Sequence, residues 1–326
     1  MNTQELLSPA TQRPHTIIPF PASQSLQASA VRKNDVIPTG LSGLDAAICP
    51  PSAEESDIDF DSRGIPQGHV TEVFGPPGVG KTALALNIAS IALCRGRKIV
   101  WIDTGSPLPR IRLRDVLQGA IQRSSSSQRV EDLMQNMIHL RAQSLPHLLA
   151  LLLHSPPGFP PPECDLVVID SASGPFPSYF PNPTELKTRL AQSKITDKAQ
   201  VQWLMNRSSN VTSDLANQLM KLATTLNMAV LAINQTRTRI KGQPRATLSP
   251  ILAGGAWESS INTRIVLYRD FATTEEGNLS GNIRFAEVMK RAGKILVQRL
   301  GENIVPFVIE SVSFTLVIHA SFAYGK

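Results

Sequence analysis

Residues 75–82 of the chain read Gly-Pro-Pro-Gly-Val-Gly-Lys-Thr and complete the pattern G-x-x-x-x-G-K-[ST]. Glycines in such a loop let the backbone turn its N–H groups toward phosphate oxygens. Lys81 brings a positive charge to the β- and γ-phosphates, and Thr82 offers a hydroxyl to Mg²⁺. The stretch therefore predicts a binding site for a nucleoside triphosphate, ATP, with Mg²⁺. The predicted contacts are Gly75, Pro76, Pro77, Gly78, Val79, Gly80, Lys81 and Thr82.

The segments on either side of this loop favour the same interpretation. Residues 70–74 have the β-rich composition of a strand, and residues 81–89 read as a helix that begins under the phosphates. The free N–H groups and dipole of a helix N-terminus stabilise an anion there. The alternative, a chance glycine-rich turn, does not require a strand before it and a helix after it.

Length and composition bound the class of protein. The chain has 326 residues, of which 42% are hydrophobic and 18% charged, enough for one large domain or two small ones. No apolar run is long enough for a transmembrane helix, and the polar N-terminus predicts no secretory signal and no membrane partner. The scattered cysteines Cys49, Cys94 and Cys164 predict a reduced intracellular protein without a zinc site. A net charge of +6 permits a polyanionic partner.

The polarity of the chain divides it into a tail and a core. Residues 1–35 are polar, without sustained periodicity, and are predicted to form a flexible tail; residues 36–326 are predicted to form one ATP-binding core. The acidic stretch 54–61 is interpreted as a solvated insertion, with a docking patch as the alternative. Residues 124–127 and the proline-rich stretch 155–163 are predicted loops.

Strand-like and helix-like segments alternate from Gly64 onward. Strands are predicted at 98–103, 166–170 and 228–233, and helices at 130–137, 145–154 and 215–226. This alternation predicts an α/β fold with a mostly parallel sheet flanked by helices. After Arg264, three further strands are predicted with turns between them, at 265–269, 283–289 and 307–317. The C-terminal end of the sheet is therefore expected to be antiparallel.

Two acidic residues end predicted strands downstream of the phosphate-binding loop. Asp170 closes an aliphatic run and is the expected second carboxylate on the Mg²⁺ side, the alternative being a helix-capping residue. Asp103 ends the strand 98–103, where many ATPases of this class place a water-activating glutamate nearby. Asp103 is therefore a candidate catalytic residue, and a loop-capping role is the alternative.

A polar pair and a basic stretch follow the strand 228–233. Gln235 is a candidate sensor of the γ-phosphate, with an ordinary turn amide as the alternative. The stretch 236–255 contains no acidic residue and reads as a long loop that either clamps single-stranded DNA or is simply solvated. The candidate DNA-binding residues are Arg237, Arg239, Lys241 and Arg245.

Taken in order, these segments resemble the RecA/RadA recombinase superfamily. The matching stretches are Thr39-Gly40 with Leu44-Asp45, Gly64-Ile65-Pro66-Gln67-Gly68 with Thr71-Glu72, the phosphate-binding loop, Trp101–Thr104, Val168–Ser171 and Asn234-Gln235. The resemblance covers roughly residues 36–320 and implies a RecA-like P-loop NTPase core. Residues 257–264, Trp-Glu-Ser-Ser-Ile-Asn-Thr-Arg, are similar to the W-x-x-x-x-N-T-R segment of the eukaryotic recombinase paralogues. These paralogues are recombination mediators that assist the strand-exchange recombinase.

The chain also departs from the family pattern. The usual D-T-E-G is Asp103-Thr104-Gly105-Ser106 here, so the position of the catalytic glutamate falls on Gly105. The resemblance thus implies ATP binding with weak, DNA-dependent hydrolysis, in which Lys81, Asp103 and Gln235 are the candidate catalytic residues. The insertion at 181–198 is longer than in the recombinase.

The resemblance implies a nuclear protein of homologous recombination and DNA double-strand break repair. Its expected partners are a second recombinase paralogue in a hetero-oligomer, the strand-exchange recombinase and single-stranded DNA. Two alternatives from other classes remain open at this point. One is a P-loop kinase for a small molecule or nucleotide, and the other is an ATP-independent scaffold of a repair complex.

Overall fold

The computed structural model describes residues 36–50, 63–124, 127–161, 163–180, 188, 192, 198–239, 247–270, 272–273, 279–280, 283–298, 300–309 and 314–316. Several predictions fall outside this part of the chain. They concern the tail at 1–35, the acidic stretch 54–61, most of the insertion 181–198, and the DNA-binding candidates Lys241 and Arg245.

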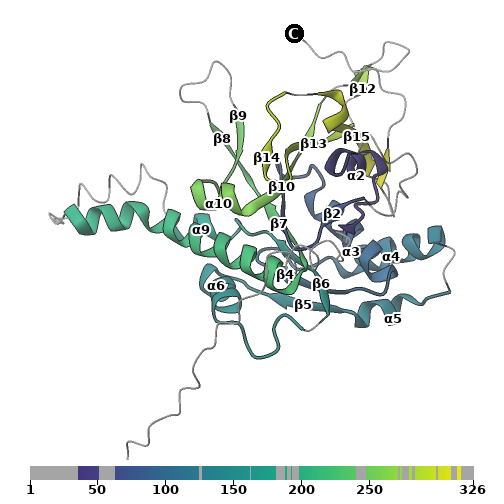
Figure 1. Cartoon of the computed structure of the whole chain (residues 1–326), viewed down its shortest axis with the longest axis horizontal. Coiled ribbons are helices and arrows are strands. Elements are labelled where there is room, and N and C mark those ends of the chain that lie inside the picture. The colour runs from purple at the N-terminus through teal and green to yellow at the C-terminus, as the bar shows by residue number, and fades with distance from the viewer. Residues whose placement is uncertain are drawn as a thin grey trace, which may run out of the picture. The chain divides into compact units, whose positions relative to one another are not determined.

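A ten-stranded sheet with the order β16-β15-β13-β10-β3-β7-β6-β4-β5, and with β14 paired to β13, forms the centre of the fold (Figure 1). Its strands are β3 (Val70–Phe74), β4 (Lys98–Asp103), β5 (Met137–Arg141), β6 (Cys164–Asp170), β7 (Ala229–Asn234), β10 (Ile261–Arg269), β13 (Arg284–Arg291), β14 (Lys294–Ile295), β15 (Ile304–Ile309) and β16 (Phe314–Leu316). The pairs from β10 through β3, β7, β6 and β4 to β5 are parallel. The pairs β10–β13, β13–β15 and β15–β16 are antiparallel, so both parts of the predicted sheet are confirmed.

Helices cover both faces of this sheet (Figure 1). One face carries α3 (Lys81–Cys94), α4 (Arg110–Ser124) and α5 (Val130–Gln135), and the other carries α6 (Leu145–Leu153), α9 (Lys198–Leu226) and α10 (Gly255–Ser260). The remaining short elements are β1 (Val36–Ile37), α2 (Ser42–Ile48), β2 (Ile65–Pro66), α7 (Phe176–Tyr179), β8 (Thr236–Arg239), β9 (Thr247–Pro250), β11 (Ala272–Thr273), β12 (Leu279–Ser280) and η2 (Gly301–Asn303).

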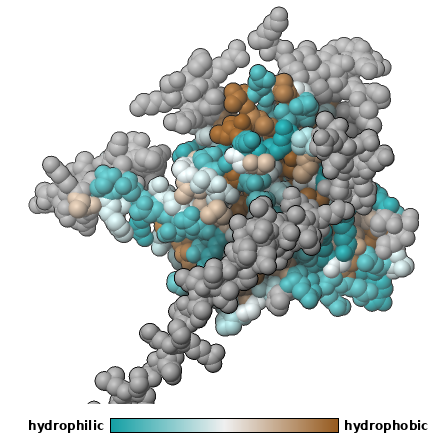
Figure 2. All heavy atoms as spheres, in the orientation of Figure 1, coloured by the Kyte–Doolittle hydropathy of each residue, from teal (hydrophilic) through white to brown (hydrophobic). Residues whose placement is uncertain are grey.

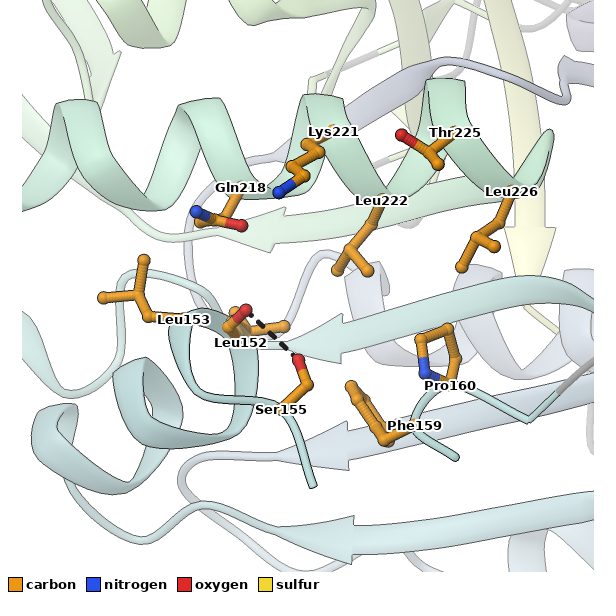
Figure 3. Close-up of a pocket in the computed structure, with 10 residues that line it drawn as sticks. All are labelled: Leu152, Leu153, Ser155, Phe159, Pro160, Gln218, Lys221, Leu222, Thr225 and Leu226. Atoms are coloured by element: carbon orange, nitrogen blue, oxygen red, sulfur yellow. Dashed lines mark hydrogen bonds between the residues drawn. The ribbon is translucent and has the colours of Figure 1, made fainter. Parts of the chain in front are cut away.

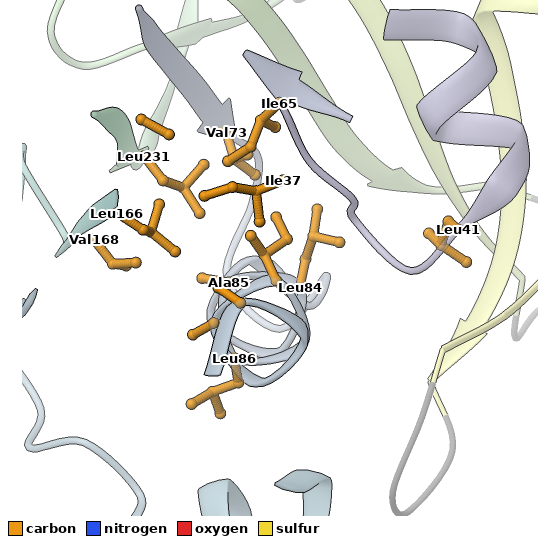
Figure 4. Packing of buried hydrophobic residues seen from close by; sticks show 14 of the residues in the cluster. Ile37, Leu41, Ile65, Val73, Leu84, Ala85, Leu86, Leu166, Val168 and Leu231 are labelled. Carbon is orange, nitrogen blue, oxygen red and sulfur yellow. The ribbon is translucent and has the colours of Figure 1, made fainter. Parts of the chain in front are cut away.

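The continuous apolar runs of the central strands are explained by this three-layer arrangement. Successive side chains of a strand point to opposite faces, so a strand covered on both faces needs apolar residues at every position. In β4, Ile99 and Trp101 join the core cluster around α3, whereas Val100 and Ile102 join the cluster against α6 and α9. Figure 4 shows the first cluster, in which side chains of α3 pack against those of the strands. Each such side chain contributes about 1.5–3 kcal/mol when fully buried.

Several elements differ from the sequence predictions. The helix predicted at 130–137 ends at Gln135, and the edge strand β5 begins at Met137. This strand lies at the edge of the sheet and none of its five residues is fully buried, so it lacks the continuous apolar run of the central strands. The helix α4 was not predicted, although its buried residues recur at helical spacing: Leu113, Val116, Leu117, Ala120 and Ile121. The single strand predicted at 307–317 is divided between β15 and β16.

The surface of the described residues is mixed in polarity. Figure 2 shows apolar residues gathered on the upper part of the face in view, over the antiparallel strands. Exposed apolar side chains in β13, in β14 and in the segment that follows β14 are Met289, Ile295, Val297 and Leu300. Within the described ranges, no helix combines the length and apolar character needed to cross a membrane.

Candidate functional site

The phosphate-binding loop lies between β3 and α3, at the carboxyl edge of the parallel strands. Two of its glycines have a left-handed backbone, with φ of 76° at Gly78 and 108° at Gly80. A Cβ on Gly80 would also lie 2.4 Å from the Cδ1 of Ile309, and one on Gly75 would lie 2.2 Å from the carbonyl oxygen of Leu267. The loop conformation therefore depends on glycine both for its torsion angles and for the close approach of β10 and β15.

The side chain of Lys81 folds back over the loop from the first turn of α3. Its Nζ donates hydrogen bonds to the carbonyl oxygens of Gly75 at 2.7 Å and of Pro76 at 2.8 Å. Burial lowers the pKa of Lys81, and the nearby carboxylate of Asp170 acts in the opposite direction. The ammonium group is thus held above the loop by neutral carbonyls, which an anionic ligand can replace as its partner.

Thr82 and Asp170 meet directly although 88 positions separate them in the sequence. The hydroxyl of Thr82 donates a hydrogen bond of 2.6 Å to Oδ2 of Asp170, which ends β6. Burial raises the pKa of Asp170, and the charge of Asp103 adds to this effect, while Thr82 and Lys81 oppose it. A hydroxyl and a buried carboxylate beside a phosphate loop match the oxygen ligands that Mg²⁺ prefers. Among the described residues, no group of three or more His, Cys, Asp or Glu side chains could hold a metal.

Asp103 lies at the end of β4, in register with Asp170. Its carboxylate accepts hydrogen bonds from the Trp101 indole at 2.7 Å and from the backbone N–H of Leu108 at 2.5 Å. The Nε2 of His139, on β5, lies 2.6 Å from the same carboxylate. Asp103 is therefore buried and engaged on both oxygens, the arrangement of a residue that positions its neighbours.

The position that the resemblance assigns to a catalytic glutamate is open. Gly105 is exposed, and a Cβ added there would meet no heavy atom within 4 Å. Its backbone is not in the left-handed region, so the geometry does not require glycine. This site would accept a larger side chain without a steric clash.

Asn234 and Gln235, adjacent in sequence, have different surroundings. The backbone N–H of Gln235 donates to the hydroxyl of Ser173 at 2.8 Å, and its side chain is exposed. Asn234 is fully buried, and its amide donates to Glu72 at 2.7 Å and to the carbonyl of Leu252 at 3.1 Å. Gln235 is thus tethered to the segment after Asp170, whereas Asn234 belongs to the interior.

Glu72 is the centre of a buried polar network that the sequence interpretation did not identify. Its carboxylate accepts hydrogen bonds from Asn234, from the Trp257 indole at 2.8 Å and from Nε of Arg264. Arg264 in turn donates to Glu258 at 2.6 Å. Burial raises the pKa of Glu72, and the charge of Arg264 is the strongest opposing influence. All members of this network lie in stretches that resemble the RecA/RadA recombinase superfamily. That resemblance was the only sign of the network in the sequence.

The sequence predicted one long loop for the basic stretch after Gln235, and this prediction is wrong. Its two ends form an antiparallel ribbon, β8 with β9, in which Arg237 is opposite Ser249 and Arg239 is opposite Thr247. Alternating threonines and arginines in β8 give the period of two that a ribbon needs, and this signal was overlooked. The ribbon extends away from the main sheet in Figure 1. The side chain of Arg237 is exposed.

A separate hollow of about 270 Å³ lies between α6 and α9, away from the residues discussed above (Figure 3). Leu152, Phe159 and Leu222 line it, together with the polar side chains of Gln218 and Lys221. No residue of the phosphate-binding loop contributes to its wall. The hollow is therefore not part of the nucleotide site.

Comparison with known proteins shows that the chain is similar in sequence to DNA repair proteins and to RecA proteins. Over 256 residues the chain is 25% identical to DNA repair protein rhp55 of Schizosaccharomyces pombe, covering 67% of this chain and 73% of that protein. It is 27% identical over 257 residues to DNA repair protein RAD51 homolog 3 of Dictyostelium discoideum, covering 70% of this chain and 61% of that protein. It is 24% identical over 272 residues to Protein RecA of Wolbachia pipientis, covering 82% of this chain and 63% of that protein. No protein-family model matches the chain.

The relatives and the geometry agree on one classification. The chain spans less than two thirds of the length of the latter two relatives, so likeness to them concerns the shared core. In this chain, the parallel sheet brings the phosphate-binding loop together with the Thr82–Asp170 pair described above. These matches and the geometry of the loop support a resemblance of the chain to the RecA/RadA recombinase superfamily.

Proposed function

We propose that this chain is an ATP-binding recombinase paralogue that acts as a recombination mediator in homologous recombination and double-strand break repair. The single observation that carries the proposal is the convergence of Lys81, Thr82 and Asp170 at a complete phosphate-binding loop. The names of the relatives, which include two DNA repair proteins, supply the biological context. One core at residues 36–326, with a tail at 1–35, remains part of the proposal.

ATP and Mg²⁺ fit the residues present at the loop. The loop N–H groups and Lys81 would hold the phosphates, and Thr82 with Asp170 would hold Mg²⁺. The metal would supply positive charge against the β- and γ-phosphates. Because burial raises the pKa of Asp170, a cation beside its carboxylate relieves an unfavourable charge. Gln235, tethered to Ser173, would report the γ-phosphate to the ribbon that begins at the next residue.

We propose that hydrolysis is weak because no carboxylate occupies position 105. Asp103 is engaged by Trp101, Leu108 and His139, which argues against its acting as a replacement base. ATP then serves mainly as a ligand that selects one conformation of the protein.

Installing a glutamate at Gly105 is expected to raise the rate of ATP hydrolysis by at least about tenfold, since a positioned general base contributes on the order of 10²–10⁴. The open space at this position lets the side chain enter without displacing a neighbour. The measurement is steady-state phosphate release with and without single-stranded DNA. Gly105→Gln has the same size without the charge and should stay at the wild-type rate. Equal rates for all three proteins would show that a missing base does not limit turnover.

We further propose that the ribbon β8–β9 and the basic stretch between its strands bind single-stranded DNA. Arg237 and Arg239 recur at alternate positions of β8, and Lys241 and Arg245 continue the positive charge. Such cations contact phosphates without reading sequence. This proposal predicts a strong dependence of affinity on salt.

Changing Arg237, Arg239 and Lys241 together to alanine should weaken single-strand binding and reduce the slope of log K against log salt by about 2, since each lost phosphate contact removes roughly 0.7. Fluorescence anisotropy with a labelled oligonucleotide at several salt concentrations measures both quantities. Arg114→Ala, which removes an exposed arginine paired with Glu131 on the α4–α5 side, is the control. An unchanged slope in the triple variant would refute the ribbon as the DNA contact.

The proposed partners are a second recombinase paralogue, in a hetero-oligomer, and the strand-exchange recombinase, and the proposed location is the nucleus. Affinity purification of the full chain from cells, followed by mass spectrometry, tests this assignment. A second recombinase-like chain in stoichiometric amount is the expected result. Recovery of the chain without one would contradict the paralogue role. Acceptor-dependent release of ADP without any effect of DNA would instead favour a P-loop kinase.

A further inference from the structure

Two arginines outside the phosphate-binding motif pack directly against its loop. Arg269, the last residue of β10, donates a hydrogen bond from Nη2 to the carbonyl oxygen of Gly78 at 2.9 Å. Arg284, the first residue of β13, is its partner in the antiparallel register. The Cδ of Arg284 lies 3.9 Å from the position that a Cβ on Gly80 would take. The sequence interpretation assigned no role to either residue.

The charge environment of this pair is unbalanced. The Nε of Arg284 is buried and has no hydrogen-bond partner. Burial lowers the pKa of Arg284, and the positive charge of Arg269 acts in the same direction. Among the described residues, no carboxylate lies within ion-pair distance of either guanidinium. Like charges at opposite positions of an antiparallel pair are destabilising, so the protein alone leaves this arrangement without compensation.

The position of the two arginines indicates which ligand would compensate the repulsion between their positive charges. In the sheet, β10 and β6 lie on opposite sides of β3, the strand that leads into the loop. The carboxylate of Asp170 approaches the loop from the β6 side, where Thr82 and the proposed Mg²⁺ lie. The arginines approach from the β10 side, where Asp270 directly follows Arg269 and is exposed. A polyanion on the loop would therefore have metal on one side and guanidinium groups on the other.

We infer that Arg269 and Arg284 are nucleotide-binding residues that contact the phosphates of a nucleoside triphosphate held by the loop. The inference rests on the proposed function, because it requires ATP to bind at residues 75–82. Guanidinium groups form strong, charge-assisted hydrogen bonds with phosphate oxygens. The pair then adds two cations to Lys81, so that nucleotide binding removes the repulsion between β10 and β13.

The test measures ATP affinity and stability on the full chain. Isothermal titration of Mg·ATP is carried out with wild type, Arg269→Gln, Arg284→Gln and Arg284→Lys, and inorganic triphosphate is used as a competitor. Each glutamine variant should bind ATP about tenfold more weakly, and Arg284→Lys should keep part of the affinity. Each glutamine variant should also bind inorganic triphosphate more weakly than wild type does, by a similar factor. Arg129→Gln, which removes an exposed arginine paired with Asp132, is the matched control and should bind like wild type.

A thermal melt separates a binding role from a structural one. Arg284→Gln removes like-charge repulsion, so its Tm without nucleotide should equal or exceed that of wild type while ATP affinity falls. Wild-type affinity in both glutamine variants would overturn the inference and leave the proposed function intact. Loss of ATP affinity with unchanged triphosphate affinity would overturn the assignment to phosphates. A wild-type chain that binds no ATP would overturn the proposed function and this inference together.

Discussion

Replacing Lys81 with alanine is expected to lower the affinity for Mg·ATP by about a hundredfold or more, because it removes the central cation of the loop. The Nζ of Lys81 is held by the carbonyls of Gly75 and Pro76, 2.7 and 2.8 Å away, and is thus already positioned above the loop. Little conformational entropy has to be lost when a phosphate replaces those partners. Titration calorimetry or a fluorescent ATP analogue measures the loss.

Two variants make this result interpretable. Lys98→Ala removes an exposed lysine that pairs with Glu163, and it should leave ATP affinity unchanged. Lys81→Arg keeps the positive charge on a side chain of different shape. Its affinity for Mg·ATP should lie between that of Lys81→Ala and that of wild type. If Lys81→Ala binds ATP and supports repair as well as wild type does, the nucleotide site is vestigial. The scaffold interpretation would then replace the one proposed above.

Changing Glu72 to alanine is expected to reduce the free energy of unfolding by about 3–5 kcal/mol, since it leaves the buried cation of Arg264 without its main partner. Asn234 and Trp257 lose a hydrogen-bond acceptor at the same time. The measurement is urea unfolding followed by circular dichroism. Because β3 continues directly into the phosphate-binding loop, ATP affinity should fall as well.

The matched control removes a glutamate from an exposed ion pair. Glu131→Ala breaks the contact with Arg114 and should cost no more than about 1 kcal/mol, the usual range for surface pairs. Replacing Glu72 and Arg264 together with leucine and methionine should recover part of the lost stability, since the buried cation is removed with its partner and Glu258, which also pairs with Arg264, is partly exposed. A loss below about 1 kcal/mol for Glu72→Ala would show that the network contributes no more than a surface pair.

The central strands and the loop were predictable because their signals are local. An apolar run such as residues 166–170 is required of a strand covered on both faces, and α3 begins where Lys81 and Thr82 predicted it. The edge strand β5 and the ribbon β8–β9 were not predicted, because edge strands and ribbons lack a second covering layer. Neither contains a continuous apolar run, and pairing with another segment decides their conformation.

Some features of the candidate site were likewise predictable from short stretches of sequence, and others depend on the fold. Short stretches of sequence identify the phosphate-binding loop. They also show that position 105 holds glycine and not glutamate. Only the folded sheet brings Thr82 to Asp170, Trp257 and Arg264 to Glu72, and Arg269 to the carbonyl of Gly78. The residues of these contacts lie 88 to 192 positions apart, so strand order, and not local propensity, determines which side chains meet.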